Sequence, residues 1–203
     1  LMAADSAVMV IDAAKGVEAQ TRKLFRVCAM RDIPIFTFIN KMDREARDPF
    51  ELCEELEKEL GIDTYAMNWP IGCGKEFQGV YDRQNRQIIH FTSNTNARAA
   101  TATQIELDDP ALAGLIGQAK KDQLTDEIEL LDGASCDFDM DRVRHGRLSP
   151  VFFGSALTNF GVEPFLEEFL RMTTPPLPRK AGEDIIDSFD DDFSAFVFKI
   201  QAN

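Results

Sequence analysis

The chain has 203 residues, of which 44% are hydrophobic, and it carries a formal net charge of −13. This length can bury a core without metals or disulfides, and the acidic balance argues against direct binding of a nucleic-acid backbone, which needs clustered Lys and Arg. No apolar run approaches the roughly 18 residues of a membrane-spanning helix, and no signal-peptide pattern opens the sequence, so we expect a cytoplasmic protein without membrane contact.

Strands and helices alternate in the first part of the chain. Ala7–Asp12 (AVMVID) and Pro34–Ile39 (PIFTFI) are short apolar runs typical of strands buried on both faces of a parallel sheet. A helix start follows, with Asp48 as N-cap acceptor, Pro49 at the first helical position and Glu51 at the capping-box position. This alternation predicts an α/β fold with a parallel sheet.

The alternation stops after Gly61. A hairpin is predicted from Gly79–Tyr81 and Gln87–Phe91, followed by a loose polar stretch rich in Thr, Asn and Ala and then by two helical pieces. We therefore expect an inserted α+β subdomain over residues 62–147. Pro150–Phe153 (PVFF) then restores the buried-strand pattern, and an amphipathic helix follows it.

Two features of the insertion permit either a binding or a structural role. Trp69, beside Pro70, could be a recognition aromatic, but packing of the insertion onto the main sheet is favoured. The Gly72–Gly74 segment could form an anion-binding nest, but a plain turn is favoured. Neither is assigned a site.

The last part of the chain is predicted to leave the sheet domain. Thr173–Pro178 (TTPPLP) is a semi-rigid linker, and Phe193–Ile200 reads as a strand with no partner strand left in the chain. The expected organisation is a sheet domain over residues 1–61 and 148–174, with the linker and the start of a second domain over 175–203. The chain begins without Met and ends directly after the strand-like run, so we expect an internal fragment of a longer protein.

The most informative motif is Asn40-Lys41-Met42-Asp43, an N-K-x-D sequence directly after the second predicted strand. Open α/β sheets bind ligands at this end of their strands. The Asp43 carboxylate can accept two hydrogen bonds at once, from the ring N1–H and the exocyclic amine of guanine, and adenine offers no such pair. The Lys41 stem can cover the base, and the Asn40 amide can tie the loop or reach the base edge. Taken alone, these four residues would favour a polar turn after a strand over a binding site.

A second loop lies where a guanine pocket would need it. Gly154, Ser155, Ala156 and Leu157 follow the PVFF strand, so their backbone amides are expected at the same sheet edge, able to donate to guanine O6. The two loops together predict a guanine site made by Asn40, Lys41, Asp43, Ser155, Ala156 and Leu157.

These motifs resemble the fourth and fifth sequence motifs of the GTPase superfamily, and the long insertion resembles translational GTPases related to elongation factor G. The stretches DSAVMVIDAAKGVEAQTRKL, NWPIGCGKEFQGVYD, GSALTNFGVEPFLEEF and FSAFVFKIQAN are more similar to the bacterial peptide chain release factor 3 family. The resemblance implies a partial P-loop-type GTPase domain whose N-terminal part is missing, and a strand near Phe193 that opens a β-barrel domain. It also implies a GTP-binding termination factor that hydrolyses GTP on the ribosome to promote departure of codon-reading release factors.

The phosphate-binding and magnesium-binding motifs of the family are missing from the sequence. No G-x-x-x-x-G-K-[ST] is present, and Gly72–Lys75 is followed by Glu76 where the motif needs a hydroxyl for magnesium. The magnesium-binding threonine and the D-x-P-G-H segment of the family are absent too. We therefore expect GTP and GDP as ligands, with Mg²⁺ bound in the longer protein. In this fragment we expect no catalytic residue and no metal-binding residue, and hence no GTP hydrolysis. Two alternatives remain, an elongation factor G-like GTPase and a non-catalytic interaction module with a vestigial guanine pocket.

Overall fold

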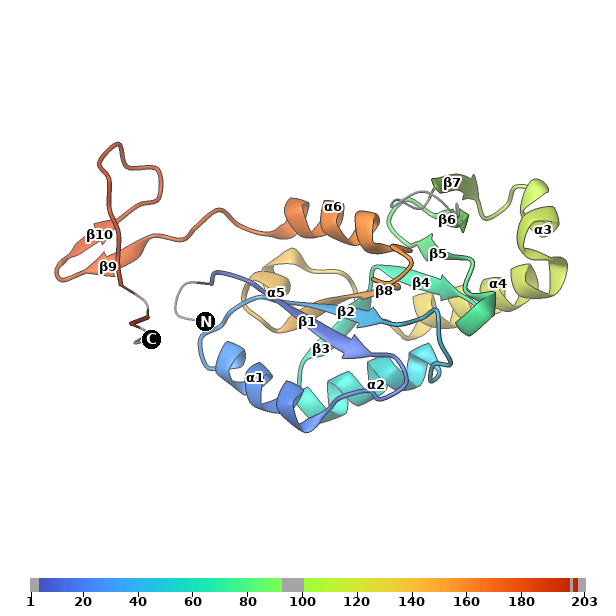
Figure 1. Ribbon diagram of the computed structural model, residues 1–203, viewed down its shortest axis with the longest axis horizontal. Helices are drawn as coiled ribbons and strands as arrows, with labels where there is room; N and C mark the ends of the chain where they lie inside the picture. The colour runs from blue at the N-terminus through green and yellow to red at the C-terminus, as the bar shows by residue number, and fades with distance from the viewer. Residues whose placement is uncertain (1–3, 93–100, 198, 201–203) are drawn as a thin grey trace.

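The computed structural model describes residues 4–92, 101–197 and 199–200. Its central element is a four-stranded parallel sheet (Figure 1). The strands lie in the order β1 (Ala7–Asp12), β2 (Ile35–Asn40), β8 (Leu148–Phe153) and β3 (Asp63–Ala66). A second, antiparallel sheet lies beside it and contains β4 (Asn68–Ile71), β5 (Gly79–Asp82), β6 (Gln87–Thr92) and β7 (Thr101–Glu106).

The remaining elements are helices and one short hairpin. The helices are α1 (Ala19–Ala29), α2 (Pro49–Leu60), α3 (Ala111–Ile116), α4 (Gln118–Ala134), α5 (Met140–Arg144) and α6 (Val162–Met172), with a 3-10 turn η1 (Gly74–Glu76). The hairpin pairs β9 (Arg179–Ala181) with β10 (Asp184–Ile186). Across the described ranges, no helix has both the length and the apolar character needed to cross a bilayer.

The predicted parallel sheet is confirmed, but the burial on both faces expected for Ala7–Asp12 is wrong, because β1 lies at the edge of the sheet and its Val8 and Val10 are exposed. The residues of β8 are all buried, as are those of β2 before Asn40, so these strands take the centre. The start of α2 is confirmed as well. The Asp48 carboxylate accepts hydrogen bonds from the amides of Phe50 (2.9 Å) and Glu51 (3.2 Å), and Gly61 ends the helix with φ at +68°.

Helices cover both faces of the parallel sheet (Figure 1). α1 and α2 lie on one face, where Leu52 and Leu56 join the same buried cluster as Ile39. α5 and α6 cover the other, and there Phe165 packs against Phe38 and Phe152 with ring centroids 5.0 and 5.1 Å apart. The sheet is therefore fixed from both sides, and its strand ends are held in place.

Trp69 connects the second sheet to the first. It is fully buried, and its ring lies 4.5 Å from that of Phe50 and 5.4 Å from that of Phe153. Its indole Nε1 donates a hydrogen bond to Glu127 at 2.8 Å, which satisfies its polar atom. The packing role favoured from the sequence is confirmed.

The inserted part begins one strand later than the boundary expected at residue 62. Residues 63–66 form β3, which pairs in parallel with β8 at the edge of the main sheet. β3 was missed because its sequence, DTYA, is short and mostly polar, and its burial depends on the neighbouring strand rather than on its own hydrophobicity. The insertion leaves the sheet only after Ala66.

Three further expectations need correction. The loose polar stretch contains β7, which pairs with β6, while residues 93–100 lie outside the described part of the chain. β4 was also missed, because it contains Pro70, and proline has no amide proton to donate to a neighbouring strand. The strand expected over Phe193–Ile200 is not formed at residues 193–197 or 199–200, and none of the sheets in the described part of the chain includes this segment. Residue 198 is outside the described part.

We predict that Trp69→Ala lowers the free energy of unfolding by about 3–5 kcal/mol, because it removes the largest side chain between the two sheets. Urea unfolding of wild type and variant measures the difference. Leu130→Ala on α4 is the control, because this side chain is 64% exposed and its loss should cost less than about 0.5 kcal/mol. Equal effects of the two substitutions would contradict the anchor role of Trp69.

Candidate nucleotide-binding site

The carboxyl ends of three neighbouring strands meet at one edge of the parallel sheet. Asp12 ends β1 beside Asn40, which ends β2, and Ile39 of β2 lies beside Phe153, which ends β8. The N-K-x-D loop follows β2 and the loop of residues 154–157 follows β8. The structure thus brings together the two segments that the sequence selected.

The link between the two loops is a hydrogen bond between side chains. The Ser155 hydroxyl donates to Oδ1 of Asp43 at 2.5 Å, across 112 positions of sequence. Ser155 is fully buried, and its amide donates to the carbonyl of Phe160 at 2.8 Å. Because the Ser155 backbone is fixed by its bond to Phe160, its buried hydroxyl fixes the orientation of the Asp43 carboxylate.

Asn40 adds a second link. Its Oδ1 accepts hydrogen bonds from the amide of Lys41 at 2.8 Å and from the amide of Ala156 at 2.9 Å. The backbones are joined as well, because the Met42 amide donates to the Gly154 carbonyl at 3.1 Å. Of the two roles considered for Asn40, the tie between loops is the one its side-chain oxygen performs.

Lys41 is fixed by a residue that the sequence reasoning missed. Its ammonium donates to Oδ2 of Asp12 at 2.7 Å, and the two side chains are 45% and 15% exposed. The hydrogen bond from Lys41 lowers the pKa of Asp12 below its ordinary value of 3.8, against the opposing effect of burial. Asp12 ends a parallel strand as Asn40 does, and that shared position was the signal available in the sequence.

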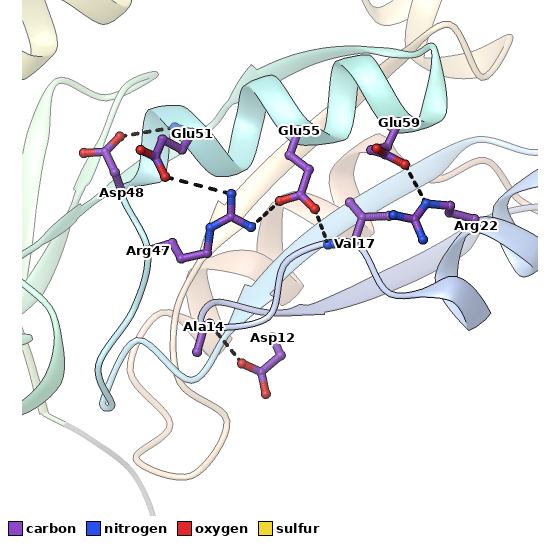
Figure 2. A network of polar contacts seen from close by, with 9 residues as sticks. All are labelled: Asp12, Ala14, Val17, Arg22, Arg47, Asp48, Glu51, Glu55 and Glu59. Atoms are coloured by element: carbon purple, nitrogen blue, oxygen red, sulfur yellow. Dashed lines mark hydrogen bonds and ion pairs between the residues drawn. The ribbon is translucent and has the colours of Figure 1, made fainter.

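A polar network supports the β1–α1 loop from the side of α2 (Figure 2). Glu55 of α2 accepts a hydrogen bond from the Val17 amide at 3.1 Å and forms an ion pair with Arg47, which follows the N-K-x-D loop. Arg22 and Glu59 form a further ion pair at 2.6 Å between α1 and α2. The segments flanking Asp12 and Lys41 are therefore both attached to one helix.

Most backbone amides of the loop after β8 already donate hydrogen bonds to other groups of the protein. Those of Gly154, Ser155 and Ala156 donate to Ile39, Phe160 and Asn40. Within the described residues, the Leu157 amide has no such partner, and the Leu157 side chain is 75% exposed. A ligand oxygen at this edge would therefore meet the Leu157 amide rather than those of the preceding residues.

The larger cavities lie elsewhere. One of about 740 Å³ is at the opposite end of the sheet, between Ile33, Pro34 and the linker residue Leu177. Another of about 590 Å³ lies along β1 and α1, beside Val10 and Leu24. Neither contains a residue of the two loops.

The described part of the chain contains no group of three or more His, Cys, Asp or Glu side chains arranged to hold a metal ion. The carboxylates of this sheet edge are instead engaged with protein donors, as Asp12 is with Lys41 and Asp43 with Ser155.

Comparison with known proteins gives a family match and several similar relatives. The family described as "Elongation factor Tu GTP binding domain" matches residues 1–175. The peptide chain release factor 3 of Symbiobacterium thermophilum is 56% identical over 207 residues, with 100% of this chain and 39% of the relative covered. That of Acaryochloris marina is 53% identical over 204 residues, with 100% and 38% covered. The chain thus spans about two fifths of the length of these relatives.

A solved crystal structure from Thermus thermophilus has a similar fold. Its TM-score is 0.60 at 22% sequence identity, and the match covers 86% of this chain and 27% of that chain. At this identity the likeness concerns the fold alone.

We predict that the Asp12–Lys41 pair makes stability depend on pH in a defined direction. The pKa of Asp12 is lowered in the folded state, so the pair stabilises fully above 3.8, and this contribution is lost as the pH falls below that value. Asp12→Asn keeps an acceptor for the Ala14 amide, which lies 3.0 Å from Asp12 Oδ1, and removes both the charge and the oxygen that accepts from the Lys41 ammonium. The difference in unfolding free energy between wild type and Asp12→Asn should therefore shrink in acid. A difference that grows as the pH falls would contradict this assignment.

Proposed function

The chain belongs to the family of elongation factor Tu GTP binding domains, and from this premise we propose that its two loops read the guanine base of GTP and GDP within a translation termination factor. The observation that carries the proposal is the Asp43 carboxylate, held by the buried Ser155 hydroxyl at the carboxyl edge of the sheet. The residues proposed to form the site are Asn40, Lys41, Asp43, Ser155, Ala156 and Leu157.

The chemistry of Asp43 suits guanine. An ionised carboxylate accepts about four hydrogen bonds, so the one from Ser155 leaves acceptor capacity for both the N1–H and the exocyclic amine of the base. Adenine presents no such pair of donors, and the carboxylate would lose hydrogen bonds against it. A site built to bond a donor can reject an analogue lacking it by a factor on the order of 10⁴.

The other residues have supporting roles in this proposal. The Leu157 amide is the donor available for guanine O6, Asn40 holds the two loops together, and Ala156 contributes the amide that Asn40 bonds. Lys41 is anchored at its ammonium by Asp12, so its aliphatic stem is available to lie against the base.

For the longer protein we propose GTP hydrolysis on the ribosome that promotes departure of codon-reading release factors, in the cytoplasm. Support comes from relatives named peptide chain release factor 3 that are more than 50% identical over the whole of this chain. These names favour a termination factor over an elongation factor G-like protein. The acidic charge of −13 leaves ribosome contact to other parts of that protein.

The chain itself is proposed to bind the base without performing the reaction. Phosphoryl transfer depends on a phosphate-binding loop and on magnesium, which neutralises the developing charge. The sequence contains no G-x-x-x-x-G-K-[ST], and its loops at the sheet edge carry base-reading rather than phosphate-binding groups.

We predict that Asp43→Asn, made in a full-length protein carrying this chain, weakens GDP binding by about 100-fold, because two charge-assisted hydrogen bonds are lost. Binding of xanthosine diphosphate should strengthen, since the amide can donate to the additional carbonyl of xanthine. Calorimetry with both nucleotides and with ADP measures the preference. Wild type should bind GDP far more tightly than ADP.

Asp48→Asn is the matched control. Asn remains a good N-cap for α2, so this change removes a nearby carboxylate while keeping the fold. The preference for guanine should persist in Asp48→Asn. Equal affinity of the wild type for GDP and ADP would overturn the proposed function, and an unchanged base preference in Asp43→Asn would overturn the role of that residue.

We further predict that the 203-residue chain alone releases no phosphate from GTP above the uncatalysed rate. Its affinity for GDP should be weaker than micromolar, because phosphate contacts supply much of nucleotide binding. A phosphate-release assay and calorimetry of the isolated chain measure both quantities. Turnover of GTP, or micromolar binding of GDP, would refute this expectation.

A further inference from the structure

Asn68 lies where the chain leaves the parallel sheet. It is the first residue of β4, two positions after the end of β3, and it is 4% exposed. Its side-chain Nδ2 donates to the carbonyl of Phe153 at 3.2 Å, and its Oδ1 accepts from the amide of Phe153 at 2.7 Å. One side chain thus satisfies both backbone groups of the last residue of β8.

This contact replaces a missing piece of strand. β3 follows β8 only as far as Ala66 beside Val151, and the Met67 amide then donates to the Val151 carbonyl at 2.8 Å before the chain turns into β4. Phe153 is fully buried, so its backbone groups on this side need partners within the protein. A side-chain amide presents a donor and an acceptor as a peptide group does, whereas a carboxylate would lack the donor.

The contact leads directly to the loop that orients Asp43. Gly154, the residue after Phe153, donates its amide to Ile39 at 3.0 Å and accepts from the Met42 amide at 3.1 Å. The next residue is Ser155, whose hydroxyl holds Asp43. The position of the Ser155 hydroxyl therefore depends on where β8 ends, which Asn68 fixes.

The insertion holds the other loop independently. The Gly74 amide donates to the Met42 carbonyl at 2.8 Å, inside the N-K-x-D loop. The turn that presents this amide requires glycine, because Gly72 has φ at +75° and a Cβ there would lie 2.4 Å from the Glu76 carbonyl oxygen. The same inserted segment thus bonds the N-K-x-D loop and the last residue of β8, which directly precedes the other loop.

We propose that Asn68 is a positioning residue of the guanine site: by pairing with Phe153 it holds the Ser155 hydroxyl, and through it the Asp43 carboxylate, in the orientation that reads the exocyclic amine. This inference rests on the proposed function. It assigns the insertion a role in base selectivity, transmitted through backbone hydrogen bonds rather than through contact with the nucleotide.

The test compares GDP with inosine diphosphate, which lacks only the exocyclic amine. Wild type, Asn68→Leu and Asn68→Asp are made in a full-length protein carrying this chain, and the dissociation constants of both nucleotides are measured. Partial unfolding lowers both affinities by the same factor, so their ratio reports the orientation of the carboxylate and not the folded fraction. We expect the preference for GDP over inosine diphosphate to fall about tenfold in Asn68→Leu, equivalent to losing one hydrogen bond.

Asn68→Asp is the second variant, in case the apolar replacement does not fold. It keeps the acceptor for the Phe153 amide but sets a carboxylate against the Phe153 carbonyl. The preference should fall here too, because the end of β8 is displaced. Retention of the full wild-type ratio in whichever of the two variants folds would overturn the inference.

Ser149→Ala is the matched control. Ser149 is also buried in β8, but at the opposite end, where its hydroxyl bonds the Ile35 carbonyl at 2.9 Å and the Thr37 hydroxyl at 2.7 Å. This variant should lose stability while its nucleotide ratio stays at the wild-type value, and an equal drop in the ratio would contradict a specific role for Asn68. If wild type itself fails to prefer GDP over both inosine diphosphate and ADP, the proposed function fails instead.

Discussion

The hydrogen bond from Ser155 to Asp43 is the interaction on which the rest of the account depends. It joins residues 112 positions apart, which is possible because β2 and β8 are parallel neighbours and their carboxyl ends face the same edge. The aromatic packing of α6 and the leucines of α2 hold these two strands from opposite faces. The hydrophobic core therefore sets the geometry of a polar site that contains few apolar atoms itself.

The inserted segment between β3 and β8 contacts both the N-K-x-D loop and the last residue of β8. A long insertion between neighbouring strands costs little additional loop-closure entropy, since that cost grows only with the logarithm of loop length. The segment is anchored by Trp69 and joined to the main sheet by Asn68. Its Gly74 amide reaches the N-K-x-D loop. Buried anchoring of this kind lets a second sheet stabilise loops that it does not contain.

Features that depend on local hydrophobicity were predicted from the sequence, whereas features that depend on contacts with distant residues were not. PIFTFI and PVFF carry their burial in their own hydrophobicity, so the two central strands were predicted correctly, whereas AVMVID forms an edge strand that is only partly buried despite its apolar sequence. β3 and the hydrogen-bonding role of Asn68 depend on distant partners, and no local pattern marks them. Asp12 was missed because its partner, Lys41, was considered only as a cover for the base. The strand expected near Phe193 failed for the converse reason, since its pattern is strand-like but no sheet in the described part of the chain includes it.

The most direct test of the central claim is a structure of the full-length protein bound to GDP. The account predicts both the N1–H and the exocyclic amine of guanine within hydrogen-bond distance of the Asp43 carboxylate, with the Ser155 hydroxyl still bonded to it. A base bound at another edge of the sheet, or an Asp43 side chain turned away from it, would contradict the account.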